Sequence, residues 1–389
     1  MTPLRILLVT KSTGGVAEYV RQLALGLDSA DFELTVACLS ENGPEFAAEL
    51  RQVAGVKAFS LQMNRYKVDP WSDAQVCLAL ARHLRRERYD LVHAHASKPG
   101  FLTRLAALGT GLPVLYSPHC FAFHAGANPV SARLVAVLEA FAARFLTTRI
   151  VTVADGERKL ARQYGVGPDE LFVTVPTGLD PRPYRQPVDK AALKASLNLP
   201  VAAPLVGTVG RLSDQKAPLD YVRMAALVHQ QLPEVQFAWV GSGPLAEAAQ
   251  NLSAELGLGA HLHFLGHRTD IPALLQVFDC FVLASAWEGF PIVLLEAMAA
   301  GAPVVATNIP GNDEALRAGV DGLLAPAHDP AALAEAVLKV LVSPGQAQAF
   351  RESARLRVES RFSRRTMLEN LSQLYRELAA GSVPLRVQV

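Results

Sequence analysis

The stretch that decides the fold is S-A-W-E-G-F-P-I-V-L-L-E-A-M-A-A-G, residues 285–301. The apolar run before it, Cys280 to Ala284, has the length and composition of a buried strand. An apolar helical pattern follows the Gly-Phe-Pro break and is closed by Gly301. Pro291 suits the first helical position, where a missing N–H costs nothing. We therefore predict a buried strand, a sharp loop and a helix.

Two carboxylates lie in this segment, Glu288 on the loop and Glu296 inside the helix. The N-terminus of a helix presents backbone N–H groups that favour phosphate. Because carboxylates repel phosphate, these two side chains are better suited to accept hydrogen bonds from hydroxyl groups. A ligand that carries both groups, a nucleotide sugar, fits this pattern. The alternative is a helix whose acids only complement its dipole.

A second segment, L-V-G-T-V-G-R-L at 205–212, has the pattern of a strand and opens into S-D-Q-K-A-P. It places Arg211 and Lys216 on one tight loop after that strand. Two fixed cations at the carboxyl end of a strand suit a diphosphate. The alternative is that both are ordinary solvated surface cations. That alternative is weaker when the segment 285–301 is considered together with this one. We expect the Lys216 side chain to be exposed.

Strand and helix patterns alternate along the whole chain, which predicts an α/β protein with doubly wound parallel sheets. A proline-rich stretch without periodicity, 176–187, predicts a linker between two domains. Helical patterns include Val16–Leu27, Pro70–Arg88, Val130–Phe145 and Arg365–Ala379. The predicted strands are Arg5–Thr10, Glu33–Leu39, Val56–Leu61, Asp90–Ala96, Val114–Pro118, Ile150–Ala154, Phe172–Val175, a strand from Leu205, Phe237–Val240, Leu262–Leu265, Cys280–Ala284, Val304–Thr307 and Gly322–Ala325.

The composition agrees with two globular domains. The chain has 389 residues, of which 50% are hydrophobic, and a net charge of +1, so a nucleic-acid partner is not expected. No apolar run is long enough to span a bilayer. The apolar stretch at the beginning of the sequence is short and is predicted to be a strand and not a signal peptide. The four cysteines lack metal-ligand spacing, so we expect buried free thiols and a cytoplasmic protein.

Four signatures in order, G-R-L-S-D-Q-K, V-G-S-G-P-L at 240–245, F-L-G-H-R at 264–268 and E-G-F-P-I-V-L-L-E, resemble those of the retaining glycosyltransferase family 4. The T-K-S-T-G-G turn at 10–15 extends the resemblance to the N-terminal half. The resemblance is to the branch that acts on bacterial polysaccharides and lipid-linked glycans. It implies the GT-B fold, in which two Rossmann-like domains face each other across a cleft.

The resemblance also implies an assignment of the domains. Residues 1–182 would form the acceptor-side domain, with the helix 365–380 packing back on it. Residues 183–364 would bind the nucleotide-sugar donor.

The same resemblance implies the site residues. His119, at the end of the strand V-L-Y-S-P-H, would contact the donor sugar. Arg211 and Lys216 would stabilise the departing diphosphate, Glu288 would hold sugar hydroxyls, and Glu296 would hold the ribose hydroxyls. These catalytic residues are joined by donor-binding residues at Gly14, Gly15, Gly241, His267, Arg268, Gly289, Phe290, Pro291, Ile292 and Glu296.

Two departures from the family pattern stand out. The family commonly has glycine after the phosphate-binding lysine, where this chain has Ala217-Pro218. In the segment 308–314 the family often has paired glycines, and here Gly311 keeps the turn. Two histidine pairs, His93 with His95 and His261 with His263, are interpreted as ordinary polar positions at strand ends.

The resulting hypothesis is a retaining hexosyltransferase that uses a UDP- or GDP-sugar and needs no cofactor. No D-x-D motif is present, and the protein's own cations replace a metal ion. The acceptor is a glycan, a lipid-linked molecule or a small molecule. Two alternatives are a nucleotide-sugar epimerase of the same architecture and a non-catalytic nucleotide-sugar-binding subunit.

Peripheral contact with the inner face of the membrane is left open. The helical pattern that ends near residue 88 carries Arg82, Arg85, Arg86 and Arg88. The helix dipole alone explains this cluster, so a solvated basic face is favoured over membrane docking.

Overall fold

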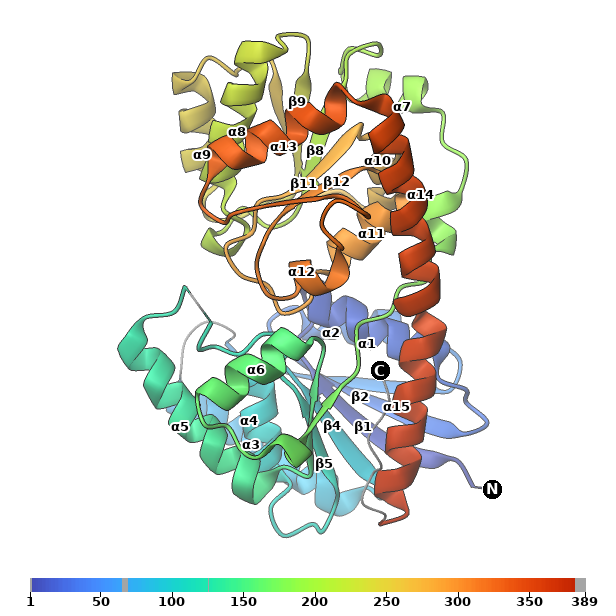
Figure 1. Ribbon diagram of the computed structural model, residues 1–389. Coiled ribbons are helices and arrows are strands. Elements are labelled where there is room, and N and C mark those ends of the chain that lie inside the picture. Colours follow the sequence, from blue (N-terminus) through green and yellow to red (C-terminus); the bar gives the residue numbers. More distant parts are fainter. Residues whose placement is uncertain (1, 65–68, 125, 382–389) are drawn as a thin grey trace. The chain divides into compact units, whose positions relative to one another are not determined.

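The computed structural model describes residues 2–64, 69–124 and 126–381 (Figure 1). The chain divides into two compact units, Met1–Gly178 with Arg364–Val389, and Leu179–Ser363. The first crossing between the units therefore falls within the proline-rich stretch 176–187, and the second lies between Ser363 and Arg364.

Unit 1 contains a seven-stranded parallel sheet with the order β3-β2-β1-β4-β5-β6-β7 (Figure 1). Each helix between two of these parallel strands forms a crossover connection, and such connections are right-handed. The helices α1 and α2 therefore cover one face of the sheet, and α3 to α6 cover the other. The last helix, α15, packs against α1 and β4. The strands are β1 (Leu4–Thr10), β2 (Phe32–Leu39), β3 (Val56–Leu61), β4 (Leu91–His95), β5 (Val114–Ser117), β6 (Arg149–Thr152) and β7 (Phe172–Thr174). The helices are α1 (Gly14–Gly26), α2 (Gly43–Leu50), α3 (Pro70–Arg86), α4 (Ser97–Ala106), α5 (Pro129–Leu146), α6 (Asp155–Gln163) and α15 (Arg364–Ala379).

Unit 2 contains a six-stranded parallel sheet with the order β10-β9-β8-β11-β12-β13. The chain starts at the central strand β8, moves to one edge, and returns to build the other side from β11. The strands are β8 (Leu205–Val209), β9 (Gln236–Val240), β10 (Leu262–Gly266), β11 (Cys280–Leu283), β12 (Val304–Thr307) and β13 (Leu323–Ala325). The helices are α7 (Lys190–Ser196), α8 (Pro218–Gln231), α9 (Ala246–Glu255), α10 (Ile271–Val277), α11 (Ile292–Ala300), α12 (Asn312–Ala315), α13 (Pro330–Leu341) and α14 (Pro344–Arg361).

The proline-rich stretch differs from the linker that the sequence predicts. Residues 179–187 belong to unit 2, and Arg182–Arg185 forms a 3₁₀ turn. Its Tyr184 side chain is buried and hydrogen-bonds to Glu296. Aperiodic sequence predicts irregular backbone, but it does not predict whether that backbone is docked. The second difference is smaller, since α11 begins at Ile292 with Pro291 in the capping position.

Each unit has its own apolar core around its sheet. In unit 2 the core includes the buried Trp239 on β9 and Phe237 beside it. The cysteines are free, with Cys38 and Cys280 buried as expected. Within the part of the chain that the structure describes, no helix is long and apolar enough to cross a membrane.

Candidate active site

The two segments singled out in the sequence meet at the carboxyl edge of the unit 2 sheet. The strands β8 and β11 are neighbours, so the loops that follow them lie side by side. The backbone N–H of Ala286 donates to the carbonyl of Gln215 at 2.8 Å and fixes the two loops together. The Lys216 Nζ then lies 2.5 Å from the Glu288 Oε1. Arg211 projects from the same loop and is exposed.

The Glu288 carboxylate is held by three protein donors. Besides Lys216, the Ser285 hydroxyl donates to Oε1 at 2.7 Å, and the Gln215 amide donates to Oε2 at 3.2 Å. The Glu288 side chain is 7% exposed and that of Lys216 is 16% exposed. The expectation that Lys216 is exposed is therefore wrong, because its ammonium group lies over the neighbouring loop. The arrangement fixes one cation at this edge of the sheet.

The residue after Lys216 has an unusual backbone. Ala217 adopts φ 45° and ψ 58°, the left-handed conformation that glycine tolerates best. It precedes Pro218, which opens α8 and restricts the preceding residue further. Ala217 therefore forms the turn that glycine commonly forms in the family, and its backbone is strained directly beside Lys216. Such strain is a frequent property of functional loops.

The loop from Glu288 to α11 is the segment whose backbone N–H groups the sequence predicts to face a ligand, and its residues Gly289, Phe290 and Pro291 are buried. The N-cap residue of α11, Pro291, makes no side-chain capping hydrogen bond. A Cβ on Gly311 would lie 2.5 Å from the carbonyl oxygen of Gly289, so the turn at 308–314 packs directly on this loop. The Phe290 side chain is buried and contacts Phe362, with 5.2 Å between the ring centroids. The Phe290 side chain therefore belongs to the core of unit 2.

Glu296 lies on the first turns of α11 and is half-buried. The Tyr184 hydroxyl donates to its Oε1 at 2.6 Å. The chain entering unit 2 therefore positions this carboxylate.

The remaining predicted residues of unit 2 lie on the loops after β9 and β10. A Cβ on Gly241 would lie 2.1 Å from the Gly210 carbonyl, so this glycine allows the loop to rest on the backbone before Arg211. The exposed His267 precedes Arg268, which pairs with Asp270 at 2.7 Å. The hydrogen bond from Arg268 lowers the pKa of Asp270. Arg268 is thus engaged within its own loop.

In unit 1 the predicted residues also gather at the carboxyl edge of the sheet. Gly14 and Gly15 begin α1 after β1, and Gly14 has a φ of 70° that favours glycine. His119 follows β5, with a φ of 57°, and Cys120 after it has a φ of 139°. Two consecutive non-glycine residues with positive φ mark this turn as strained.

His119 has a partner, His95, that was not predicted from the sequence. The Nδ1 of His95 lies 3.0 Å from the Nε2 of His119, and the Tyr19 ring lies 4.7 Å from the His119 ring. His93 is also buried, with its Nδ1 2.7 Å from the Tyr375 hydroxyl and its Nε2 2.8 Å from the Ser117 hydroxyl. The interpretation of His93 and His95 as ordinary polar positions at strand ends is wrong. In the sequence H-A-H the two histidines are two positions apart on a strand, so both lie on one face of the sheet. This spacing is the sequence feature that could have indicated a histidine cluster.

The histidines of this cluster are held neutral. Burial lowers the pKa of His93 and that of His119 to about 3 each, and it also holds the pKa of His95 well below its ordinary value. Neutral imidazoles can donate from one nitrogen and accept at the other. The cluster therefore offers His119 as a hydrogen-bonding group without a positive charge.

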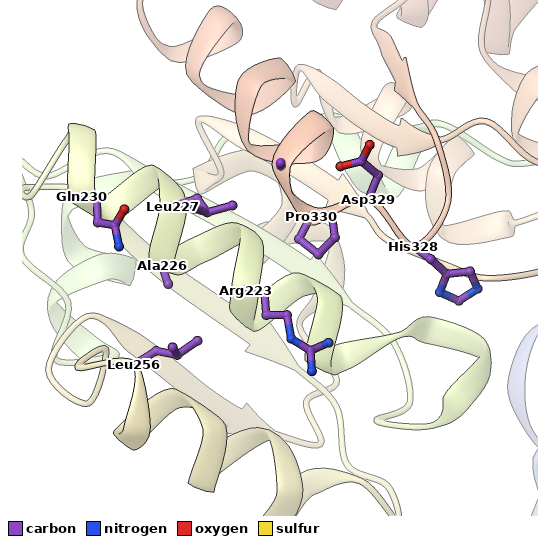
Figure 2. Close-up of a pocket in the computed structure, with 9 residues that line it drawn as sticks. Arg223, Ala226, Leu227, Gln230, Leu256, His328, Asp329 and Pro330 are labelled. Carbon is purple, nitrogen blue, oxygen red and sulfur yellow. The ribbon is translucent and has the colours of Figure 1, made fainter.

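Unit 2 also contains a hollow of about 390 Å³ between α8 and the start of α13 (Figure 2). None of the predicted site residues lines it. Among the residues that line it, Figure 2 labels Arg223 and Leu227 on α8, and Pro330 at the start of α13 with His328 just before it. This hollow has no part in the site described above.

Two family models match the chain. Residues 14–178 match a "Glycosyl transferase 4-like domain" and residues 189–357 match "Glycosyl transferases group 1". The UDP-Gal:alpha-D-GlcNAc-diphosphoundecaprenol alpha-1,3-galactosyltransferase of Escherichia coli is 31% identical over an alignment of 322 residues that covers 81% of this chain and 81% of the relative. The D-inositol 3-phosphate glycosyltransferase of Saccharomonospora viridis is 29% identical over 400 residues, covering 96% of this chain and 91% of the relative.

Solved structures agree with the fold. The crystal structure of Anabaena Alr3699/HepE in complex with UDP and glucose matches with a TM-score of 0.81 and 22% sequence identity. The match covers 96% of this chain and 100% of that one.

Proposed function

This chain belongs to the glycosyl transferases group 1 family and has the GT-B fold, and from that premise we propose that it is a retaining hexosyltransferase acting on a UDP-sugar and a lipid-linked acceptor. The UDP in the HepE structure and the UDP-Gal named for the Escherichia coli relative support the donor. The diphosphoundecaprenol in that relative's name supports the acceptor. The inositol phosphate relative supports a small-molecule acceptor as the second candidate.

The observation that carries the proposal is the cation held by Glu288. Lys216, with Arg211 on the same loop, lies at the carboxyl edge of a parallel sheet, the usual ligand-binding edge of such sheets. Charge accumulates on the nucleoside diphosphate as its bond to the sugar breaks. A positioned cation stabilises that charge without having to reorganise. The amides at the start of α11 add dipoles of the same sign.

We propose the remaining roles on the resemblance. Glu296 accepts hydrogen bonds from the ribose hydroxyls, His119 contacts the sugar, and Gly14, Gly15 and Gly241 allow close approach of the donor. His267 and Arg268 border the base. Glu288 positions Lys216 and lies beside the sugar hydroxyls.

The proposed stereochemistry is retention by front-face attack. The bond between the anomeric carbon and the diphosphate breaks, the acceptor oxygen bonds on the same face, and the departing phosphate oxygen takes the acceptor proton. A double displacement needs a carboxylate nucleophile. Glu288 suits that role poorly, because Lys216, Ser285 and Gln215 already donate to its oxygens.

The test is transfer from labelled UDP-sugars to a panel containing polyprenyl-diphosphate sugars and inositol phosphate, followed by NMR of the product. Transfer with an α linkage from an α-linked donor supports the proposal. A β linkage refutes retention, and a glycosylated Glu288 peptide in the mass spectrum refutes front-face attack. An altered nucleotide sugar without transfer indicates an epimerase, and binding without either reaction indicates a non-catalytic subunit.

Metal independence is tested separately. The protein supplies its own cations to the diphosphate, so we expect full activity in excess EDTA. Loss of activity on chelation, with recovery on addition of Mg²⁺ or Mn²⁺, contradicts this part of the proposal.

A further inference from the structure

The helix α5 exposes large apolar side chains to solvent along one face. Val130 is 79% exposed, Leu134 62%, Val137 67%, Phe141 51% and Phe145 61%, and Leu138 is 44% exposed. At 100° per residue these six side chains fall within an arc of about 100°. We call this set the α5 stripe.

The opposite face of α5 is built from small residues. Ala132, Ala136, Ala142 and Ala143 are buried and face the core of unit 1. A surface helix normally does the reverse and buries its large apolar residues. Packing in the core of unit 1 therefore does not explain why the exposed face of α5 carries large apolar residues.

The charges on this helix have one sign on the exposed face. The other exposed residues of α5 are Pro129, Ser131, Arg133 and Arg144. The helix contains one carboxylate, Glu139, which is buried and paired with Arg104 at 2.7 Å. Arg133 and Arg144 lie on the same flank of the α5 stripe, about 300° and 320° around the helix from Val130.

We propose that the α5 stripe docks on the surface of an anionic lipid bilayer, with its apolar side chains at the acyl boundary and the two arginines at the headgroups. A helix with an apolar face and cations beside it lies in the plane of a membrane interface. Anionic headgroups supply the negative charge that the exposed face of α5 lacks. Long arginine side chains reach the headgroups while their stems cover apolar surface.

A second copy of the chain is a poorer occupant of the same face. In an antiparallel pair of α5 helices, Arg133 of one copy lies opposite Arg144 of the other. No carboxylate on the exposed face would compensate for these like charges, which disfavour such a contact.

The docking surface lies on the unit that carries His119. The loop after β5 leads from His119 to Asn128, whose side chain accepts from the backbone N–H of Val130 at 3.0 Å and caps α5. The N-terminal end of α5 is therefore reached from the carboxyl edge of the sheet. The proposal goes beyond the transferase function and does not depend on it, since lipid binding requires no turnover.

Flotation of the full-length protein with vesicles tests the proposal. We expect binding to vesicles of phosphatidylglycerol and phosphatidylethanolamine and weaker binding to phosphatidylcholine alone. The double variant Leu134→Gln/Phe141→Gln should lose roughly tenfold or more in partition. Arg133→Gln/Arg144→Gln should lose about fivefold per arginine on anionic vesicles only.

The matched control is Leu25→Gln, which changes a half-exposed leucine on α1, a helix of the opposite sheet face. It should bind as the unchanged protein does. All the changed side chains are exposed, so thermal unfolding should be unaltered, which shows that the variants fold.

Absence of binding to any vesicle overturns the proposal, as does equal loss of binding in Leu25→Gln and the α5 variants. A dimer in light scattering that Leu134→Gln/Phe141→Gln converts to a monomer also overturns it, because the stripe then covers a second copy.

Discussion

At the residue scale, Lys216 and Glu288 behave as one group. The ammonium group of Lys216 lies 2.5 Å from a carboxylate that is 7% exposed. Removing one partner of a buried pair leaves the other without its counter-charge, which costs more than the pair itself contributes. A change at Lys216 therefore acts on both catalysis and stability.

We predict that Lys216→Ala lowers kcat by at least tenfold, a loss of about 2–4 kcal/mol of transition-state stabilisation. We also predict a loss of about 1–3 kcal/mol in the free energy of unfolding, because Glu288 is left without its cation. Steady-state kinetics and urea unfolding measure the two effects.

The control is Lys216→Ala/Glu288→Gln. The neutral amide no longer needs a cation, so stability should recover in part while turnover stays low. Wild-type turnover in Lys216→Ala contradicts the proposed role of the cation, and an unchanged free energy of unfolding contradicts the description of the pair.

At the element scale, α15 is tied to the histidine cluster of unit 1. The Tyr375 hydroxyl lies 2.7 Å from the His93 Nδ1, and His93 stacks near His95 with 4.1 Å between the ring centroids. His95 in turn contacts His119. The last helix of the chain thus supports the strand ends at the proposed site.

We predict that Tyr375→Phe lowers the free energy of unfolding by about 1–2 kcal/mol, because the buried His93 loses a hydrogen-bond partner. A double-mutant cycle with His93→Asn should give a coupling of similar size, since the two changes remove the same contact. Additive effects in urea unfolding would mean that the hydrogen bond does not stabilise the protein.

At the scale of the whole molecule, the buried histidines set the response to acid. Their pKa values are lowered in the folded state, so between about pH 6.5 and pH 3 the unfolded chain binds more protons than the folded one. Stability is then lost as the pH falls through this window.

From pH 7.5 to pH 5.5 we predict a loss of roughly 1 kcal/mol for the buried His93, with losses of the same sign for His95 and His119. Urea unfolding at the two pH values measures it. His93→Gln should reduce the dependence by the share of one of the three histidines. A free energy that does not change with pH contradicts the assignment of neutral buried histidines.

Much of the fold could be predicted, since alternating strand and helix patterns are local. The segments 205–212 and 280–301 became β8, β11 and α11 with their loops together, because parallel neighbouring strands end at the same edge. The docking of residues 179–187 could not be predicted, since an aperiodic stretch carries no local signal of its contacts. Neither could the partial burial of Lys216, which depends on a residue 72 positions away.

The sequence alone determined the two-sheet α/β architecture, the family and the edge at which the cations lie, because hydrophobic periodicity and short motifs are properties of neighbouring residues. Only the tertiary structure decided which side chains pair there: Lys216 with Glu288, Tyr184 with Glu296, and His95 with His119. Likewise, only the tertiary structure decided that the alanines of α5 are buried and that its large apolar residues are exposed to solvent. The physical reason is that pairing and burial depend on distances between segments that are remote in the chain, and folding alone fixes those distances.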